Sequence, residues 1–415
     1  MQKHHDNFSK YSDRFSEIIK LSTELNIIQD YDILLEKILS HARKIVNADA
    51  GTIYIKDNNE LVFSHTQNQT LQDRLPPGRK LIYNFFRIPI NKKSISGYAA
   101  LTGEVVNIPD VYKLSDKVPY KFNSKYDKIS SYRTKSVLAV PLKKNIKEVA
   151  GVLQIINAKD NKGNIIRFAK DDEPFIIHFA NTASLILERA QMTRALLMRM
   201  IEMAELHDPK ETGAHVNRVA SYSVEIYERW ARRRKIDLHE IERNRDMLRM
   251  AAMLHDVGKI AISDVILKKS SKLTHNEYDI MKTHTSLGAR LFKDRQSDFD
   301  EIARIVALNH HENWDGTGYP GEIDLNPEDF SKKNSKTNHE VKKRDKIPIF
   351  GRIVALADVF DALSSKRVYK EEWKEDDVFA EIKKQAGKKF DPELVEIFFE
   401  AINEIRAISE RYKDE

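Results

Sequence analysis

The hydrophobic pattern differs between the two halves of this chain, and that difference constrains the fold more than any other feature. Between residues 50 and 157, short apolar segments of strand length indicate β-strands, whereas from His207 almost to the C-terminus the apolar residues recur with helical spacing. A chain of 415 residues is also too long for one typical domain. The sequence therefore predicts an α+β domain followed by an all-α domain.

The first half predicts an antiparallel sheet flanked by helices. Residues 15–46 have helical spacing, and the segment 94–103 indicates a short helix between two pairs of strands. The expected strands are 50–55 with 60–64, and 136–142 with 149–157. Each pair is joined by a short polar turn, so we expect neighbouring strands to run antiparallel.

A long helix is expected to connect the two domains, over residues 174–206. Pro174 suits the first turn of this helix, and no glycine interrupts it. Its apolar residues recur at alternating spacings of four and three: Phe179, Ala183, Ile186, Ala190, Thr193, Leu197, Met200 and Ala204. Such a seam favours a parallel coiled coil between two copies of the chain, and the alternative is one helix docked on its own domain.

Composition excludes several classes of function. The chain has no cysteine, so disulfides, thiolate metal sites and iron–sulfur clusters are ruled out. Its net charge of +6 is spread over interspersed residues of both signs, which suits an anionic small ligand better than a nucleic-acid polymer. We find no apolar run long enough to span a bilayer and no signal peptide, and therefore expect a cytoplasmic protein with no membrane partner.

The stretch from His310 to Pro320, HHENWDGTGYP, places two adjacent histidines before a tight loop. Apolar residues precede it with helical spacing, and Gly316, Gly318 and Pro320 cannot continue a helix. Neighbouring side chains on a helix point about 100° apart. Both imidazoles can therefore bind one metal ion only at a distorted helix end, or else two ions share them.

Other imidazoles and carboxylates in the second half complete a set of candidate metal ligands. Asp358 belongs to an otherwise apolar helix, where an unpaired carboxylate is costly and normally meets a cation. The whole set is Glu211, His215, His255, Asp256, His284, His310, His311 and Asp358. Nitrogen and oxygen ligands without cysteine favour Fe, Mn or Zn, and eight ligands exceed the need of one ion. We therefore expect two or three divalent ions sharing bridging carboxylates.

The first half resembles a GAF domain, over roughly residues 16–190. The segments that carry the resemblance are 95–104, 136–142 and 151–157. It implies a sensor domain with a pocket for a small ligand that the sequence does not identify. Some GAF domains bind cyclic nucleotides through a motif that Asn157, Lys159, Phe168, Asp172 and Glu173 approximate here. Ala158 separates the Asn from the Lys, and we favour a structural role for these residues.

The second half, residues 207–415, resembles an HD-GYP domain. The resemblance rests on His255-Asp256-x-Gly258-Lys259 and on the full run at 310–320. It implies metal ligation by His255, Asp256, His284, His310, His311 and Asp358. Glu211 and His215 match the extra ligands of members with a third metal, which implies a trinuclear centre of iron, with manganese as the alternative.

The resemblance also implies a reaction and its substrate contacts. HD-GYP domains hydrolyse cyclic di-GMP to pGpG or GMP, with His255, Asp256 and Lys259 in catalytic positions. The implied substrate contacts are Lys259, Tyr319, Asp361, Arg367 and Lys370. For the last three, a role as charges at a helix end on the surface is the alternative.

The resulting prediction is a polar tail (1–15), a GAF sensor (16–173), a connecting helix (174–206) and an HD-GYP domain (207–415). The polar stretch 322–346 is longer than the family's usual connection, so we expect an exposed insertion beside the site. The predicted function is hydrolysis of cyclic di-GMP by a metal-bridged hydroxide under GAF control. The alternative is a receptor or protein-interaction module that binds cyclic di-GMP without hydrolysing it. Hydrolysis of another nucleotide is disfavoured by the complete Gly-Tyr-Pro loop.

Overall fold

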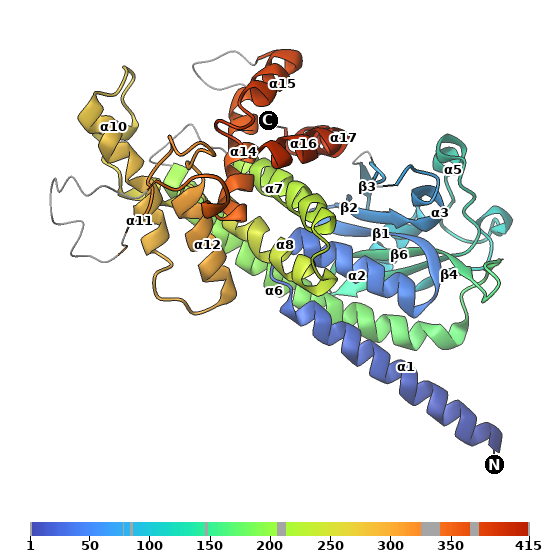
Figure 1. Ribbon diagram of the computed structural model, residues 1–415. Helices are drawn as coiled ribbons and strands as arrows, with labels where there is room; N and C mark the ends of the chain where they lie inside the picture. Colours follow the sequence, from blue (N-terminus) through green and yellow to red (C-terminus); the bar gives the residue numbers. More distant parts are fainter. Residues whose placement is uncertain are drawn as a thin grey trace. The chain divides into compact units, whose positions relative to one another are not determined.

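The computed structural model divides into two compact units, residues 1–194 and 195–415. It describes residues 2–77, 79–83, 86–145, 148–205, 213–323, 325, 341–365 and 373–413, with side chains of 2–13 and 204–205 left aside. Figure 1 shows an α+β first unit and a helical second unit, which confirms the predicted fold class. Across these described ranges, no helix is both long and apolar enough to cross a membrane.

The first unit is built on one antiparallel sheet. Its strand order is β3-β2-β1-β6-β5-β4, and β7 pairs with β6. The strands are β1 (Ala48–Asp57), β2 (Glu60–Asn68), β3 (Arg87–Pro89), β4 (Val106–Ile108), β5 (Val137–Lys143), β6 (Val149–Lys159) and β7 (Ile165–Ile166). Both predicted strand pairs are therefore present, and β1 against β6 joins them at the centre.

Side chains along these strands point alternately to the two faces of the sheet, and each face has its own hydrophobic core. Ile53, Leu138 and Leu153 are fully buried in a core shared with α1 (Gln2–Ile27), α2 (Tyr31–Ile45) and α6 (Glu173–Glu205). These helices run along the sheet in Figure 1. Tyr54 and Val152, one residue away, belong to the opposite core with α4 (Ile95–Thr102). A period of two sends successive side chains to opposite faces, so the sheet is covered on both sides. The short helices α3 (Gln69–Gln72) and α5 (Lys125–Ser130) lie in the connections.

The structure buries the first part of the predicted seam on α6 in the core of the first unit. Phe179 and Ala183 are fully buried in the core of the first unit, and Ala190 is 2% exposed there. This part of the seam docks the helix on its own domain, which was the alternative interpretation. The large hydrophobic side chains exposed along the helix include Leu185, Met192, Leu196, Met200 and Met203, and among these five only Met200 belongs to the predicted seam. The seam pattern fitted both situations because a helix packed on a sheet and a coiled coil both need an apolar stripe.

Two predicted boundaries also differ from the observed elements. Helix α1 begins at Gln2, so the segment expected as a polar tail at 1–15 is helical from the second residue onward. The two units meet at residues 194 and 195, inside α6, rather than at its end. The connecting helix therefore contributes its first part to one unit and its last part to the other.

The second unit is a helical bundle around one hydrophobic core. Helix α7 (Gly213–Arg233) packs against α8 (Leu238–Met253) and α14 (Ile349–Ser364), and α8 packs against α12 (Asp298–Asn309). The other elements are η3 (Val257–Ala261), α9 (Asp264–Leu267), α10 (His275–Lys282), α11 (His284–Arg290), η4 (Arg344–Lys346), α15 (Glu375–Lys384), α16 (Pro392–Glu400) and α17 (Ile402–Arg411). Capping boxes at Thr274 and Ser297 fix where α10 and α12 begin. Candidate ligands follow the C-terminal ends of α8 and α12 directly.

Candidate metal centre

Helix ends deliver the histidines of the second unit to one place. Helix α8 ends at Met253, and His255 and Asp256 follow in the next turn. Gly258 then passes so close to α11 that an added Cβ would lie 1.9 Å from the carbonyl oxygen of His284. Only glycine permits that approach, which brings His284 beside Asp256. His310 is the residue at which α12 ends, so the predicted helix end lies between the two adjacent histidines.

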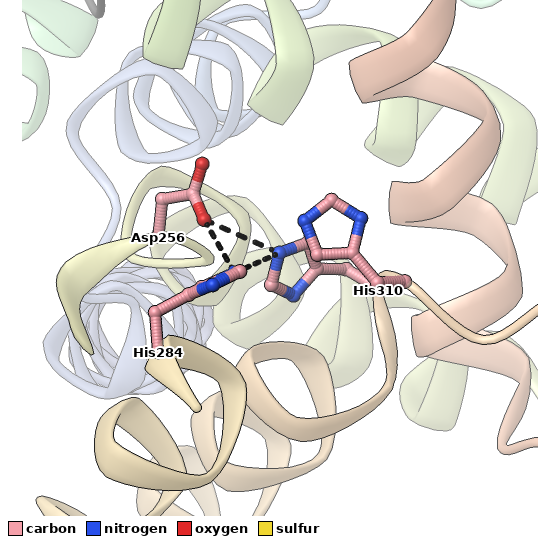
Figure 2. A group of neighbouring side chains, drawn as sticks. Asp256, His284 and His310 are labelled. Atoms are coloured by element: carbon pink, nitrogen blue, oxygen red, sulfur yellow. Dashed lines mark hydrogen bonds and ion pairs between the residues drawn. The ribbon is translucent and has the colours of Figure 1, made fainter. Parts of the chain in front are cut away.

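The first group of side chains consists of Asp256, His284, His310 and His311, whose ligand atoms all lie within 4.8 Å of one another. Asp256 Oδ1 is 3.1 Å from Nε2 of His284 and 3.3 Å from Nε2 of His310. The two Nε2 atoms are 3.4 Å apart. Figure 2 shows these three side chains converging on one point from separate elements.

The second group consists of His215, His255 and Asp358. Asp358 Oδ1 is 3.7 Å from Nε2 of His215 and 4.0 Å from Nε2 of His255. The other oxygen of Asp256, Oδ2, lies 3.4 Å from Nε2 of His255. Asp256 thus turns one carboxylate oxygen toward each group, which is the arrangement of a bridging carboxylate.

The hydrogen bonds of these histidines show which ring nitrogen is free to bind a metal ion. Nδ1 of His284 is 2.7 Å from the Met281 carbonyl oxygen. His255 and His310 have the same kind of partner, at 2.9 Å from Ala252 O and 3.0 Å from Ala307 O. A carbonyl oxygen only accepts hydrogen bonds, so each Nδ1 carries the proton and each Nε2 carries a lone pair. Several lone pairs then face one another and a carboxylate, and a bound cation would turn this repulsion into coordination.

Burial and neighbouring charges keep these groups in their metal-binding forms. Burial raises the pKa of Asp256, but Lys259 and His255 outweigh it and hold the pKa well below its ordinary value. Burial is also the main reason why the pKa of His310 is lowered and that of His311 is lowered strongly. An ionised carboxylate among neutral imidazoles is what a divalent metal ion requires. Nitrogen and oxygen donors of this kind fit first-row divalent ions.

Seven of the eight predicted ligands thus lie in two adjacent groups, and the eighth, Glu211, lies outside the described residues. Lys259 places Nζ 2.8 Å from Asp256 Oδ2, next to the point where the two groups meet. Tyr319 packs its ring on His311, with centroids 4.9 Å apart. Burial raises the pKa of Tyr319, so its hydroxyl stays protonated.

The structure places Asp361 differently from the substrate contact that the sequence predicted. Its side chain is 2% exposed and lies 2.8 Å from Nδ1 of His215. Arg218 contacts the same carboxylate, with Nε 2.6 Å from Oδ1. Burial raises the pKa of Asp361, but the hydrogen bonds from His215 and Arg218 outweigh it and lower the pKa. Asp361 is therefore directed at a candidate ligand rather than at the surface. The predicted contacts Arg367 and Lys370 lie outside the described residues.

The predicted insertion at 322–346 is described only at its two ends. Residues 341–346 return to the Gly-Tyr-Pro loop, where the backbone N–H of Arg344 donates to the carbonyl of Trp314 at 2.9 Å. Lys342 donates from Nζ to Asn309 Oδ1 at 3.0 Å, directly before His310. This end of the stretch therefore contacts the segment that carries the histidines.

Sequence reasoning missed Arg218 and Lys389. Arg218 lies three residues after His215 on α7, a spacing that places both on one helix face and could have drawn attention to it. Lys389 is half-buried, and its backbone carbonyl accepts from the N–H of Trp314 at 3.1 Å. Burial lowers the pKa of Lys389, while the charge of Asp358 opposes that shift. No local motif distinguishes Lys389 from the chain's many surface lysines.

The cyclic-nucleotide motif of the first unit makes hydrogen bonds and ion pairs within the unit. Lys159 forms an ion pair with the buried Asp49, and Asp172 lies 2.7 Å from Arg14. Glu173 accepts from Asn107 Nδ2 at 2.8 Å. These partners give the motif a structural role, as the sequence analysis favoured.

Three family models match the chain. The GAF domain model matches residues 30–187, and the HD domain model matches residues 212–363, with a further HD model over 338–394. The HD match contains both groups of metal-ligand candidates. The chain therefore contains a GAF domain and an HD domain. Within the HD domain it carries the complete run from His310 to Pro320 together with His255-Asp256-x-Gly-Lys, the motifs on which the resemblance to HD-GYP domains rests.

Curated relatives match about half of this chain. A 3'3'-cGAMP-specific phosphodiesterase 2 of Vibrio cholerae is 36% identical over 54% of this chain and 38% of its own length. A cyclic di-GMP phosphodiesterase of the same organism is 36% identical over 52% of this chain and 41% of its own. A cyclic di-GMP phosphodiesterase of Thermotoga maritima is also 36% identical, over 53% and 52%. The chain thus matches about half or less of the length of these relatives.

Proposed function

We propose that this chain is a metal-dependent phosphodiesterase that hydrolyses cyclic di-GMP to pGpG, GMP or both. The observation that carries the proposal is the pair of buried ligand groups joined by Asp256. Relatives named as cyclic di-GMP phosphodiesterases support the choice of substrate. A pure receptor would need no such arrangement, so hydrolysis is favoured over binding alone.

Each described residue of the site would have its own role in this reaction. Bound divalent ions supply a water of lowered pKa as the nucleophile and neutralise charge that develops on the phosphate. His284, His310 and His311 would hold one ion, His215, His255 and Asp358 another, and Asp256 would bridge them. Lys259 lies against Asp256 and provides an additional cation where a phosphate would approach.

We further propose three ions, iron in preference to manganese. Glu211 precedes His215, a member of the second group, by four residues in the sequence, which is close enough for both to serve one ion. The substrate contacts would be Lys259, Tyr319, Arg367 and Lys370. Arg367 can grip a phosphate with two hydrogen bonds or stack on a guanine.

A second candidate substrate is 3'3'-cGAMP. The relative that carries this name is as similar to the chain as the cyclic di-GMP phosphodiesterases are. Both substrates contain the same phosphodiester linkages, and they differ at one base. Direct competition between the two will therefore decide between them.

The first unit would regulate the enzyme by binding a small ligand.

Helix α6 would join two copies of the chain. The exposed side chains Leu185, Met192 and Leu196 support a homodimer. Because the chain has no cysteine, Met192→Cys provides a selective cross-link, with Lys128→Cys on the surface of the same unit as the control. Rapid oxidation of Met192→Cys to a covalent dimer would support this contact, and equal slow oxidation of both variants would contradict it.

The enzymatic proposal is tested by anaerobic single-turnover incubation of iron-reconstituted protein with each cyclic dinucleotide, with products separated by chromatography. We expect pGpG or GMP from the wild type and none from His255→Ala or Asp256→Ala. Tight binding of substrate without product would identify a receptor. Full activity in both variants would contradict the assignment of the metal ligands.

A further inference from the structure

The orientation of His215 depends on a carboxylate from another helix, unlike that of its neighbours. His255, His284 and His310 each direct Nδ1 at a carbonyl oxygen three residues earlier in the chain. His215 instead directs Nδ1 at Asp361 Oδ2, 2.8 Å away and 146 residues later in the sequence. Local helix geometry therefore orients three of these imidazoles, whereas a tertiary contact orients the fourth.

The contact with Asp361 also decides which nitrogen of His215 is available to a metal. A carboxylate that accepts from Nδ1 places the proton there, and Nε2 keeps its lone pair. Nε2 is the atom that faces Asp358, at 3.7 Å. Without the carboxylate, the ring could rotate or adopt the other tautomer, and the second group would lose a donor.

Arg218 holds this carboxylate from the opposite side with two nitrogen atoms. Its Nε lies 2.6 Å from Asp361 Oδ1, and its Nη2 lies 3.0 Å from Oδ2. The third nitrogen, Nη1, donates to the carbonyl oxygen of Tyr412 at 2.8 Å. Arg218 is 4% exposed and Asp361 1%, so this is a buried two-point contact of fixed geometry.

We propose that Arg218 and Asp361 are positioning residues that orient His215 for metal binding at the second group. Arg218 fixes the plane of the carboxylate, and the carboxylate fixes the ring and tautomer of His215. Through its bond to Tyr412, Arg218 also ties this arrangement to the residue that follows α17. The inference rests on the proposed metal centre, but it does not depend on which substrate is hydrolysed.

The test is titration of the metal-free full-length chain with Mn²⁺, in which free Mn²⁺ is measured by electron paramagnetic resonance. In Arg218→Met and Asp361→Ala we expect one class of sites to bind about 10- to 100-fold more weakly, the usual cost of losing an orienting partner. Sites formed by Asp256, His284, His310 and His311 keep their affinity. Arg218→Lys, which retains the charge but not the two-point geometry, recovers part of the loss.

Arg249→Met is the matched control. Arg249 is also buried, and it contacts Ser221 Oγ at 2.7 Å and the hydroxyl of Tyr412, the residue that Arg218 also contacts, at 3.3 Å. We expect wild-type Mn²⁺ affinities in this variant. Equal losses of Mn²⁺ affinity in Arg249→Met and Arg218→Met, or wild-type binding in both Arg218→Met and Asp361→Ala, would overturn the inference.

If Arg218→Met does not fold, as judged by circular dichroism, the same comparison is made between Arg218→Lys and Arg249→Lys. Wild-type protein that binds Mn²⁺ but hydrolyses no cyclic dinucleotide would refute the proposed function alone.

Discussion

Each unit of this protein buries an aspartate among polar groups, and the two surroundings differ in one respect. Asp49 in the first unit accepts from Thr70 and Tyr132, each at 2.8 Å, and pairs with Lys159. Asp256 in the second unit has Lys259 on one oxygen, while its other oxygen faces two imidazole lone pairs. Donors surround the first carboxylate, whereas acceptors surround half of the second.

This contrast separates a structural polar cluster from a metal site without reference to any relative. Tyr132 also accepts from Asn157 Nδ2 at 2.9 Å, and the Asn157 side chain accepts from the N–H of Lys135 at 2.7 Å. Hydrogen bonds supplied by the chain therefore extend through the Asp49 cluster. Around Asp256 Oδ1, the described residues supply imidazole lone pairs where a bound cation would supply the balancing charge. Burial alone does not distinguish the two sites, since both aspartates are less than a tenth exposed.

The largest expected difference is in catalysis and metal content. Asp256→Asn should reduce hydrolysis by roughly 10³-fold, because a bridged metal contributes several kcal/mol to the reaction. The same substitution at Asp49 should leave metal content and basal hydrolysis within about twofold of wild type, since Asp49 touches no candidate ligand. Inductively coupled plasma mass spectrometry and single-turnover rates measure both quantities. Loss of metal in Asp49→Asn would contradict the distinction between a structural aspartate and a metal-binding one.

Removal of metal should affect the two units unequally. Chelation withdraws a stabilisation of about 2.7 kcal/mol at a metal concentration 100 times the dissociation constant. Hydrogen exchange followed by mass spectrometry should therefore accelerate in peptides covering η3 and the end of α12. Peptides from β1 and β6 should exchange as before. Equal acceleration in both units would show that the metal acts on the fold as a whole.

The smallest effect concerns Asp49 and pH. Burial raises the pKa of Asp49, but Lys159, Thr70 and Tyr132 outweigh it and lower the pKa below the ordinary value of 3.8. On acidification the unfolded chain binds a proton first, so this stabilisation is complete above pH 3.8 and is lost as the pH falls through the folded value. Asp49→Asn should cost about 1–2 kcal/mol near neutral pH. Urea unfolding of the wild type and of Asp49→Asn at about pH 3 should show a smaller difference between their free energies of unfolding. A difference that does not change with pH would contradict the ion pair of Asp49 with Lys159.

The sequence by itself determined the order of the domains, the fold class and the set of candidate ligands. These properties depend on local information, because a change of period distinguishes strands from helices and an interrupted helix places His310 and His311 at its end. The need for glycine at position 258 was not visible in the sequence, because it comes from the close approach of the backbone to His284 on α11.

Only the tertiary structure decided how these residues are grouped. It assigned Asp361 to His215, across 146 residues, where the sequence had predicted a contact with substrate. It also buried Phe179 and Ala183 of α6 in their own domain, although the same stripe predicted a coiled coil. In both cases the pattern along the chain gives the direction of a side chain on its helix. The identity of the neighbour that it meets depends on how distant helices and strands pack, which spacing in the sequence does not specify.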